Sequence, residues 1–288
     1  MKLFRYIIPI MLMSVITCGL AAQERRALAI GIGQYKDSSW GRINADGDLR
    51  YVSEVLEEFR FTDVTVLKNE EATKSAIVSE ISDLAARSGK GDIIYVHFSG
   101  HGQQVKDLDG DEEDGYDESW IPYDAYRKCC AEDDGSMHLM DDEINVLLDG
   151  LRGKVGSEGQ ILVVVDACHS GGSSRGTGEH EEFISRGVGD IFVPSAAPAP
   201  RNLASEEWVQ ISACEDYQVN FEVRKPKVGK LTYCLYKLRK RLPELSNDEL
   251  MDELTDMMDS PEMISPMPQT PHFGEGKDRY DVRNVFRR

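Results

Sequence analysis

Short apolar runs alternate with amphipathic segments along this chain, and that alternation limits the folds open to it. The apolar runs are rich in β-branched residues, as expected of strands buried on both faces, and lie at residues 26–33, 64–67, 92–96, 161–165 and 208–213. Apolar residues recur at helical spacing in residues 48–61, 73–86, 141–151, 230–242 and 247–258. We therefore expect an α/β fold of three layers, with a mostly parallel central sheet flanked by helices.

Chain length and net charge limit the domain number and the kinds of partner that this chain can have. A chain of 288 residues holds one large domain or two small ones, and 41% hydrophobic residues suffice for a core. The formal charge of −18 opposes binding to nucleic acid or to anionic membranes, because both attract cationic surfaces. It is compatible with basic substrates or metal cations. A stretch rich in Gly, Ser, Ala and Pro, residues 173–205, predicts a flexible linker between a larger front part and a smaller back part.

The first 22 residues have the pattern of a secretory signal peptide: a basic start, an apolar stretch and small residues before the expected cleavage point. We expect export to the periplasm or the exterior. Lipidation at Cys18 is the less favoured alternative, because Thr17 is a poor residue before a lipidated cysteine. No other segment is long and apolar enough to cross a bilayer. Removal of Cys18 leaves an odd number of cysteines, which points to one reactive thiol, and the disulfide pairing of the others stays open.

Two motifs that carry chemistry each follow one of the apolar runs, HFSGHG at residues 97–102 and DACHSG at residues 166–171. Open α/β sheets bind ligands where such strands end. A cysteine beside an imidazole is the arrangement of nucleophilic thiol catalysis, so Cys168 is the candidate nucleophile and His101 the candidate base. The backbone N–H groups of Gly102 and Cys168 are candidate oxyanion donors. We interpret His97, inside the strand, as a packing residue, and the side chain of His169 as diverging from that of Cys168.

In these motifs the chain resembles the metacaspases and their bacterial caspase-like relatives, which are caspase-type cysteine peptidases. The most specific likeness is SGHG at residues 99–102 followed by an acidic run at residues 107–118, a feature of metacaspases rather than of animal caspases. The resemblance implies a three-layer caspase-like sandwich over residues 26–274. It also implies three parts and a tail: a large-subunit-like part (26–172), the linker (173–205), a small-subunit-like part (206–274) and a C-terminal tail (275–288).

The resemblance further implies an endopeptidase with a His101/Cys168 dyad that cleaves proteins or peptides after Arg or Lys. It implies calcium stimulation, no organic cofactor and a monomer. Three alternatives stay open. One is a catalytically silent caspase-like binding or regulatory module, and the intact dyad speaks against it. The second is a calcium-binding interaction domain, and the third is a different Arg-specific peptidase branch with the same dyad.

A pocket for a basic side chain needs a carboxylate, because guanidinium pairs with carboxylate in a bidentate geometry. Asp166 lies two residues before Cys168, on the same face of the expected strand. By resemblance Asp166 is one pocket acid and Asp48, at the start of the first helix, is the second. Asp46 is the alternative to Asp48, whose other use would be a helix cap.

The acidic run does not match the pattern of a calcium-binding loop of the helix–loop–helix kind, because Glu112 stands where the turn needs glycine. The resemblance instead implies calcium ligands at Asp117, Asp141 and Asp142. Arg175 stands where the family carries a further ligand, and this departure weakens the calcium expectation.

Three arginines in the linker are candidates for self-cleavage by an Arg-specific enzyme: Arg175, Arg186 and Arg201. The sequence Ser185-Arg186-Gly187 and its surroundings predict exposed, flexible chain there. We therefore expect the linker to be open to its own enzyme.

Overall fold

The computed structural model describes residues 23–108, 110, 112, 114–168, 183–195 and 207–287. The expected signal peptide (1–22) with Cys18 lies outside the described residues. So do His169, Arg175 and Arg201, and so do residues 173–182 and 196–205 of the expected linker.

A six-stranded sheet forms the centre of the molecule, in the order β11-β8-β7-β3-β1-β2. Its strands are β1 (Arg25–Gly31), β2 (Asp63–Lys68), β3 (Ile93–Ser99), β7 (Gln160–Asp166), β8 (Val209–Ser212) and β11 (His272–Phe273). Five of them are parallel, and β11 pairs antiparallel with β8 at one edge. Strands β3 and β7 are almost wholly buried, which explains their continuous apolar runs.

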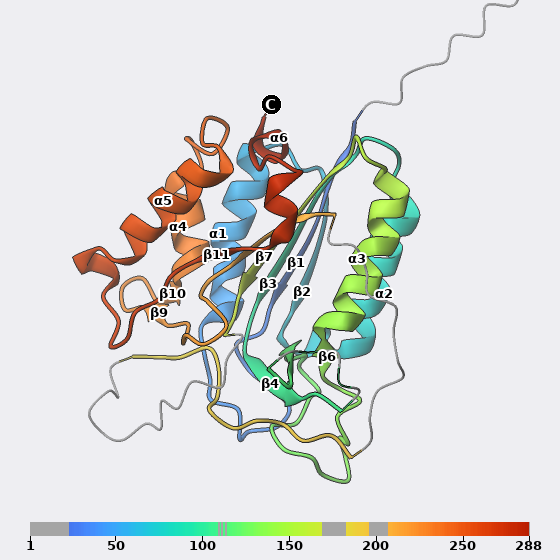
Figure 1. The fold of residues 1–288 in the computed structure, drawn as a ribbon, viewed down its shortest axis with the longest axis vertical. Helices are drawn as coiled ribbons and strands as arrows, with labels where there is room; N and C mark the ends of the chain where they lie inside the picture. Colours follow the sequence, from blue (N-terminus) through green and yellow to red (C-terminus); the bar gives the residue numbers. More distant parts are fainter. Residues whose placement is uncertain are drawn as a thin grey trace, which may run out of the picture.

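Helices cover both faces of the sheet (Figure 1). One face carries α1 (Ala45–Glu58), α4 (Lys230–Leu238), α5 (Asn247–Met258) and α6 (Arg283–Phe286), and the other α2 (Lys74–Arg87) and α3 (Asp141–Val155). The apolar stripe of each long helix points into one of two cores, one on each side of the sheet. Within the described part of the chain, no helix has the length and apolar character to traverse a bilayer.

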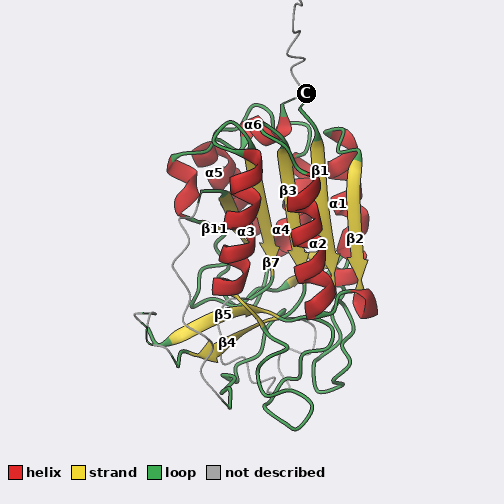
Figure 2. Ribbon diagram, turned by 90° about the vertical axis from the view of Figure 1, so that its right-hand side faces the viewer, coloured by secondary structure: helices red, strands yellow, loops and turns green. Residues whose placement is uncertain are grey.

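A smaller sheet of β4 (Gly102–Lys106), β5 (Tyr116–Trp120) and β6 (Leu139–Met140) lies beyond the carboxyl ends of the parallel strands (Figure 2). A two-stranded ribbon joins β9 (Glu222–Val223) to β10 (Val228–Gly229). Short 3₁₀ turns complete the described elements at η1 (Asn69–Glu71), η2 (Pro261–Met263) and η3 (Glu275–Asp278). Neither small sheet was expected from the sequence, because strands this short leave little periodicity to detect.

The structure departs from expectation at helix ends, at the C-terminal tail and in the linker. Helix α1 begins at Ala45 rather than at residue 48, and α4 ends at Leu238 rather than at residue 242. The expected tail packs on the body through α6, where Phe286 is fully buried with its ring 4.8 Å from that of Phe59. Residues 183–195 of the expected flexible linker pack against the body, and Arg186 among them is 0% exposed.

Candidate active site

The parallel register of β3 and β7 brings the two motifs together. Ser99 pairs with Asp166, so His101 and Cys168 each lie two residues beyond a paired position on adjacent strands. One residue beyond Ser99, the Gly100 N–H still donates to the Asp166 carbonyl oxygen, at 3.4 Å. Local strand pairing alone therefore directs the imidazole and the thiol to one end of the sheet.

A segment of the chain itself lies across this end. The carbonyl oxygen of Arg186 accepts hydrogen bonds from the backbone N–H groups of Gly102 and Cys168, each at 3.1 Å. The Arg186 N–H donates to the Asn220 carbonyl at 2.9 Å, and the Glu222 N–H donates to the Ile184 carbonyl at 2.9 Å. Residues 184–186 thus run as an added antiparallel strand beside residues 220–222, with one carbonyl held by the two N–H groups proposed from sequence as oxyanion donors.

The tautomer of His101 follows from its partners. Its Nε2 lies 2.8 Å from the Gly41 carbonyl oxygen, which only accepts, so Nε2 carries the proton. Its Nδ1 is buried without a hydrogen-bond partner and has a free lone pair. Burial lowers the pKa of His101 to about 4, although the carbonyls of Gly41 and Arg186 act to raise it. The imidazole is therefore neutral near pH 7, the state that a general base needs.

Two aromatic residues hold the imidazole in place. The Trp40 ring stacks on it at a centroid distance of 5.2 Å, and the Tyr35 ring lies at the same distance. The Tyr35 hydroxyl accepts the His101 backbone N–H at 2.7 Å, and the Trp40 indole N–H donates to Ala125 at 3.0 Å. Both are positioning residues that the sequence analysis did not identify, because neither belongs to a motif.

The Cys168 thiol is enclosed. It is 2% exposed, and its sulfur accepts the Asn220 N–H at 3.1 Å. Burial, opposed by the neighbouring N–H donors, raises the pKa of Cys168 to about 12. With residues 184–187 seated, the thiol is therefore protonated at neutral pH, and its proton has to leave during attack rather than before it.

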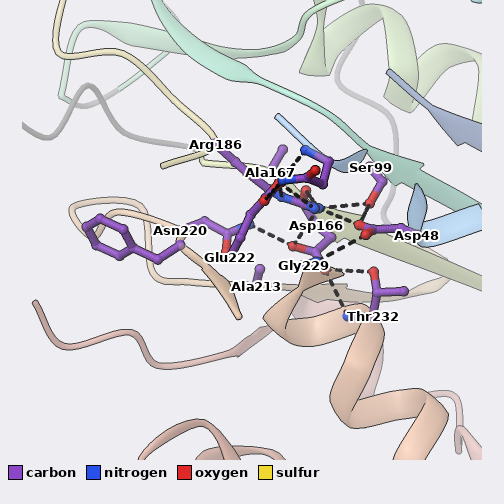
Figure 3. A network of polar contacts seen from close by, with 12 residues as sticks. Asp48, Ser99, Asp166, Ala167, Arg186, Ala213, Asn220, Glu222, Gly229 and Thr232 are labelled. Atoms are coloured by element: carbon purple, nitrogen blue, oxygen red, sulfur yellow. Dashed lines mark hydrogen bonds and ion pairs between the residues drawn. The ribbon is translucent and has the colours of Figure 1, made fainter. Parts of the chain in front are cut away.

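The Arg186 side chain fills a buried acidic pocket (Figure 3). Its Nη1 lies 2.6 Å from Asp48 Oδ2 and 3.3 Å from Asp166 Oδ1, and its Nη2 lies 3.1 Å from Glu222 Oε1. The hydroxyl of Ser99 accepts from Nη1 at 3.0 Å and donates to Asp48 at 2.6 Å. Three buried carboxylates thus surround one guanidinium, and their charge raises the pKa of Arg186 against the opposing effect of burial.

The pocket floor is braced from two sides. Asn220 Nδ2 donates to Asp166 Oδ1 at 2.8 Å, and both the N–H and the hydroxyl of Thr232 donate to Oδ2. Burial acts to raise the pKa of Asp166, but Arg186 and these donors outweigh it, so the pKa lies below its ordinary value. For Asp48, burial prevails and raises the pKa to about 6. Gly229 forms one wall, where a Cβ would overlap both the Asp166 carboxylate and the guanidinium.

A chain of buried hydrogen bonds extends from the pocket into the core. Because the Thr232 hydroxyl donates to Asp166, its free lone pair accepts from His97 Nε2 at 3.2 Å. The other ring nitrogen of His97 then accepts from the Tyr95 hydroxyl at 3.3 Å. His97 does pack inside β3, as the sequence suggested, but it also orients the threonine that holds the pocket carboxylate.

The structure brings most of the candidate site residues together and leaves one of them apart. His101, Cys168, Gly102, Asp166 and Asp48 converge on Arg186, whereas Asp46 does not. The Asp46 carboxylate faces Lys68 and Asn69 instead, at 3.5 and 3.4 Å, so its assignment as a pocket acid is wrong.

The expectation that Arg186 is exposed is also wrong. Its side chain is 0% exposed and is paired with three carboxylates that compensate its buried charge. Glu222 is the pocket acid that the sequence analysis missed. Nothing local in the sequence signals a carboxylate that meets an arginine 36 residues earlier in the chain.

The acids expected to hold calcium lie at the small sheet and the start of α3. Asp117 is buried in β5, and Asp141 begins α3 beside Asp142. Asp141 Oδ1 is buried without a hydrogen-bond partner. Carboxylate oxygens suit calcium, yet among the residues that the structure describes no three His, Cys, Asp or Glu side chains are already grouped to hold a metal.

The chain is similar to several known proteins. A model of the caspase domain family matches residues 24–273. Metacaspase-1B of Aspergillus fumigatus is 36% identical over 160 residues, which cover 51% of this chain and 36% of that protein. Metacaspase-1 of Sclerotinia sclerotiorum is 33% identical over 160 residues, covering 51% and 35%. The chain therefore spans about a third of the length of these curated relatives.

Two solved structures share the fold. The protein GSU0716 of Geobacter sulfurreducens superposes with a TM-score of 0.62 at 25% identity, over 87% of this chain and 92% of that one. Caspase-1 of Spodoptera frugiperda superposes with a TM-score of 0.57 at 13% identity, over 88% of each chain, and shows the fold alone. The α/β sandwich expected from the sequence is confirmed.

Proposed function

Because the chain belongs to the caspase family of peptidases, we propose that it is a cysteine endopeptidase that cleaves after arginine and first cuts itself between Arg186 and Gly187. The observation that carries the proposal is the position in which Arg186 is bound. Its guanidinium occupies the acidic pocket while its carbonyl oxygen accepts from Gly102 and Cys168. Residues 184–187 therefore lie as a bound substrate would lie.

The first half of the reaction follows from the tautomer of His101. Its free Nδ1 takes the Cys168 proton as the sulfur bonds to the Arg186 carbonyl carbon. The negative charge that develops on the carbonyl oxygen is held by the two backbone N–H groups already directed at it. Protonated His101 then gives the proton to the Gly187 nitrogen, the C–N bond breaks, and a thioester joins Cys168 to Arg186.

Water completes the cycle. His101 takes a proton from water as the hydroxyl oxygen attacks the thioester carbon, and the proton returns to the sulfur when the C–S bond breaks. The products are a chain that ends at Arg186 and a new amino terminus at Gly187. The Gly41 carbonyl supports both halves, because it keeps the Nε2 proton in place and stabilises the imidazolium that forms between them.

The pocket favours arginine over lysine. Nε and Nη2 of Arg186 both contact Glu222 Oε1, at 3.3 and 3.1 Å, while Nη1 reaches Asp48. An ammonium is a single point of charge and does not reach both sides of the pocket at once. We expect kcat/KM for an arginine peptide to exceed that for the matched lysine peptide by about tenfold, the value of one charge-assisted hydrogen bond.

The test is hydrolysis of fluorogenic peptides that differ only in the residue before the cleaved bond: Arg, Lys, Asp or Leu. The wild type is expected to cleave the Arg peptide fastest, the Lys peptide more slowly, and the Asp and Leu peptides at background. Cys168→Ala serves as the control without a nucleophile. Wild-type rates equal to those of Cys168→Ala on every peptide would point to a silent binding module instead.

We also propose that calcium stimulates the enzyme through Asp117, Asp141 and Asp142. The support is Asp141 Oδ1, a buried carboxylate oxygen without a partner, next to two further acids. Calcium would supply the missing partner and neutralise the clustered charge at the start of α3. In the described part of the chain these acids do not yet surround one point, so no catalytic step is assigned to the ion.

Calcium binding is measured directly by titration calorimetry on the Cys168→Ala protein. The wild-type acids are expected to give a saturable isotherm, and Asp141→Asn is expected to remove it. Asp149→Asn, on the same helix but outside this cluster, is the matched control and should bind normally. A flat isotherm with all three acids intact, or an unchanged one in Asp141→Asn, would contradict the assignment.

A further inference from the structure

The chain beyond Arg186 stays on the enzyme. Residues 187–192 run parallel to β4, with bridges between Gly187 and Gly102 and between Phe192 and Val105. The Phe192 N–H donates to the Gln104 carbonyl at 2.9 Å, and the Lys106 N–H donates to the Phe192 carbonyl at 2.8 Å. The outer edge of β4 therefore takes up the segment that follows the cleaved bond, as an added strand.

One side chain of this segment enters a pocket. Phe192 is 1% exposed and packs against Val105 and Met140, with the His138 ring 4.1 Å from its own. The flanking Ile191 and Val193 are 40% and 54% exposed and point outward. Phe192 is the only fully buried residue between positions 187 and 195, and Val188 is the one partly buried apolar residue of this stretch that packs elsewhere on the body, against Trp40, Ile121 and Ala125.

The buried side-chain amide of Gln103 binds the backbone of the segment two residues before Phe192. Gln103 is 0% exposed and donates through Nε2 to the Asp190 carbonyl at 2.9 Å. Its Oε1 accepts from His138 Nε2 at 3.2 Å, which fixes both the amide and the ring that lines the pocket. Because the Gln103 amide contacts a backbone oxygen, it tolerates any residue at that position. The pocket, in contrast, selects the side chain that enters it by size and polarity.

We propose that the edge of β4, with the pocket of Val105, His138 and Met140, is a substrate groove for the leaving side of the cleaved bond. It selects an aromatic or large apolar side chain at the sixth residue after that bond. The inference rests on the proposed function, which makes Arg186 the residue before the bond. The chain's own segment occupies the groove first, held by backbone hydrogen bonds to β4, by Gln103 and by Phe192, and once cut it competes with a substrate protein for these same positions.

The test uses three long peptides that share Arg-Gly at the cleaved bond. One carries Phe at the sixth position after the bond, one carries Ala there, and the third carries its only Phe at the fifth position, which in this chain faces solvent. Self-cleaved wild type and Phe192→Ala are compared by the ratio of kcat/KM values within each enzyme. We expect the sixth-position Phe peptide to exceed the other two by about tenfold, more clearly in Phe192→Ala because its own segment competes less.

The outcomes separate the two proposals. A short fluorogenic arginine substrate with no residues beyond its leaving group is measured alongside. If it is cleaved while the three long peptides have equal kcat/KM in both enzymes, the groove is wrong and the peptidase assignment stands. An equal gain from Phe at the fifth position also overturns the groove, because it shows general hydrophobic attraction. If no substrate is cleaved, the proposed function itself fails.

Discussion

Purified wild-type protein is expected to consist of two fragments, the second beginning at Gly187, whereas Cys168→Ala stays joined at that bond. The Arg186 carbonyl already rests on two N–H donors, and its side chain is paired with three carboxylates, so little reorganisation precedes attack. Loss of the nucleophile should slow self-cleavage by on the order of 10⁴-fold or more. Intact mass and N-terminal sequencing of the fragments are the measurements.

The choice of bond is tested by replacing each linker arginine. Arg186→Gln should stay uncut at this position, while Arg186→Lys should be cut slowly, because a positive charge remains in the pocket. Arg175→Gln and Arg201→Gln are the matched controls and should still release a fragment that begins at Gly187. Because Arg186→Gln leaves buried carboxylates uncompensated, its thermal unfolding is recorded beside that of Arg186→Lys. A Gly187 terminus in Cys168→Ala would refute self-cleavage.

The second large effect is expected at the pocket floor. Asp166→Asn should lower kcat/KM for an arginine peptide by roughly 10²- to 10⁴-fold, the usual cost of removing one partner from a buried ion pair. Asp166 is fully buried, contacts the guanidinium and is held by donors from Asn220 and Thr232. An amide in its place carries no charge and presents a donor where only acceptors fit.

The matched control is Asp46→Asn. Asp46 lies on the same first turn of α1 as Asp48, but its carboxylate faces Lys68 near the surface, so kcat/KM should stay close to wild type. Circular dichroism and thermal unfolding establish that each variant is folded before its rates are compared. The pocket assignment is lost if folded Asp166→Asn cleaves arginine peptides at the wild-type rate, or if both variants lose activity equally.

The strands and helices could be predicted because each depends mainly on its own residues. Strands β3 and β7 are buried on both faces, so their sequences are continuous apolar runs, and Thr73 caps α2 through its own hydroxyl. The small sheet of β4, β5 and β6 was not predictable in this way. Its strands span two to five residues, and the segments between them, residues 107–115 and 121–138, show no periodicity.

In the candidate site, too, residues in local motifs were predicted and residues that depend on distant partners were not. Cys168, His101 and Gly102 were identified because each lies in a short motif directly after a strand, and parallel strands end together. Glu222, Tyr35 and the hydrogen-bonded role of His97 were missed. Each depends on a partner far along the chain, such as Thr232, which lies 135 residues from His97. No local pattern reports a contact of that kind.

The amino-acid sequence alone predicted the layers, the candidate dyad and the pocket acids Asp166 and Asp48, since periodicity and short motifs are local properties of the chain. Only the tertiary structure decided what residues 183–195 do. Their composition predicts exposed linker, yet carboxylates from α1, β7 and β9 meet around Arg186 and bury it, and the edge of β4 takes the chain beyond it. Burial of a charged side chain depends on the charges that surround it in space, and folding alone brings those charges together.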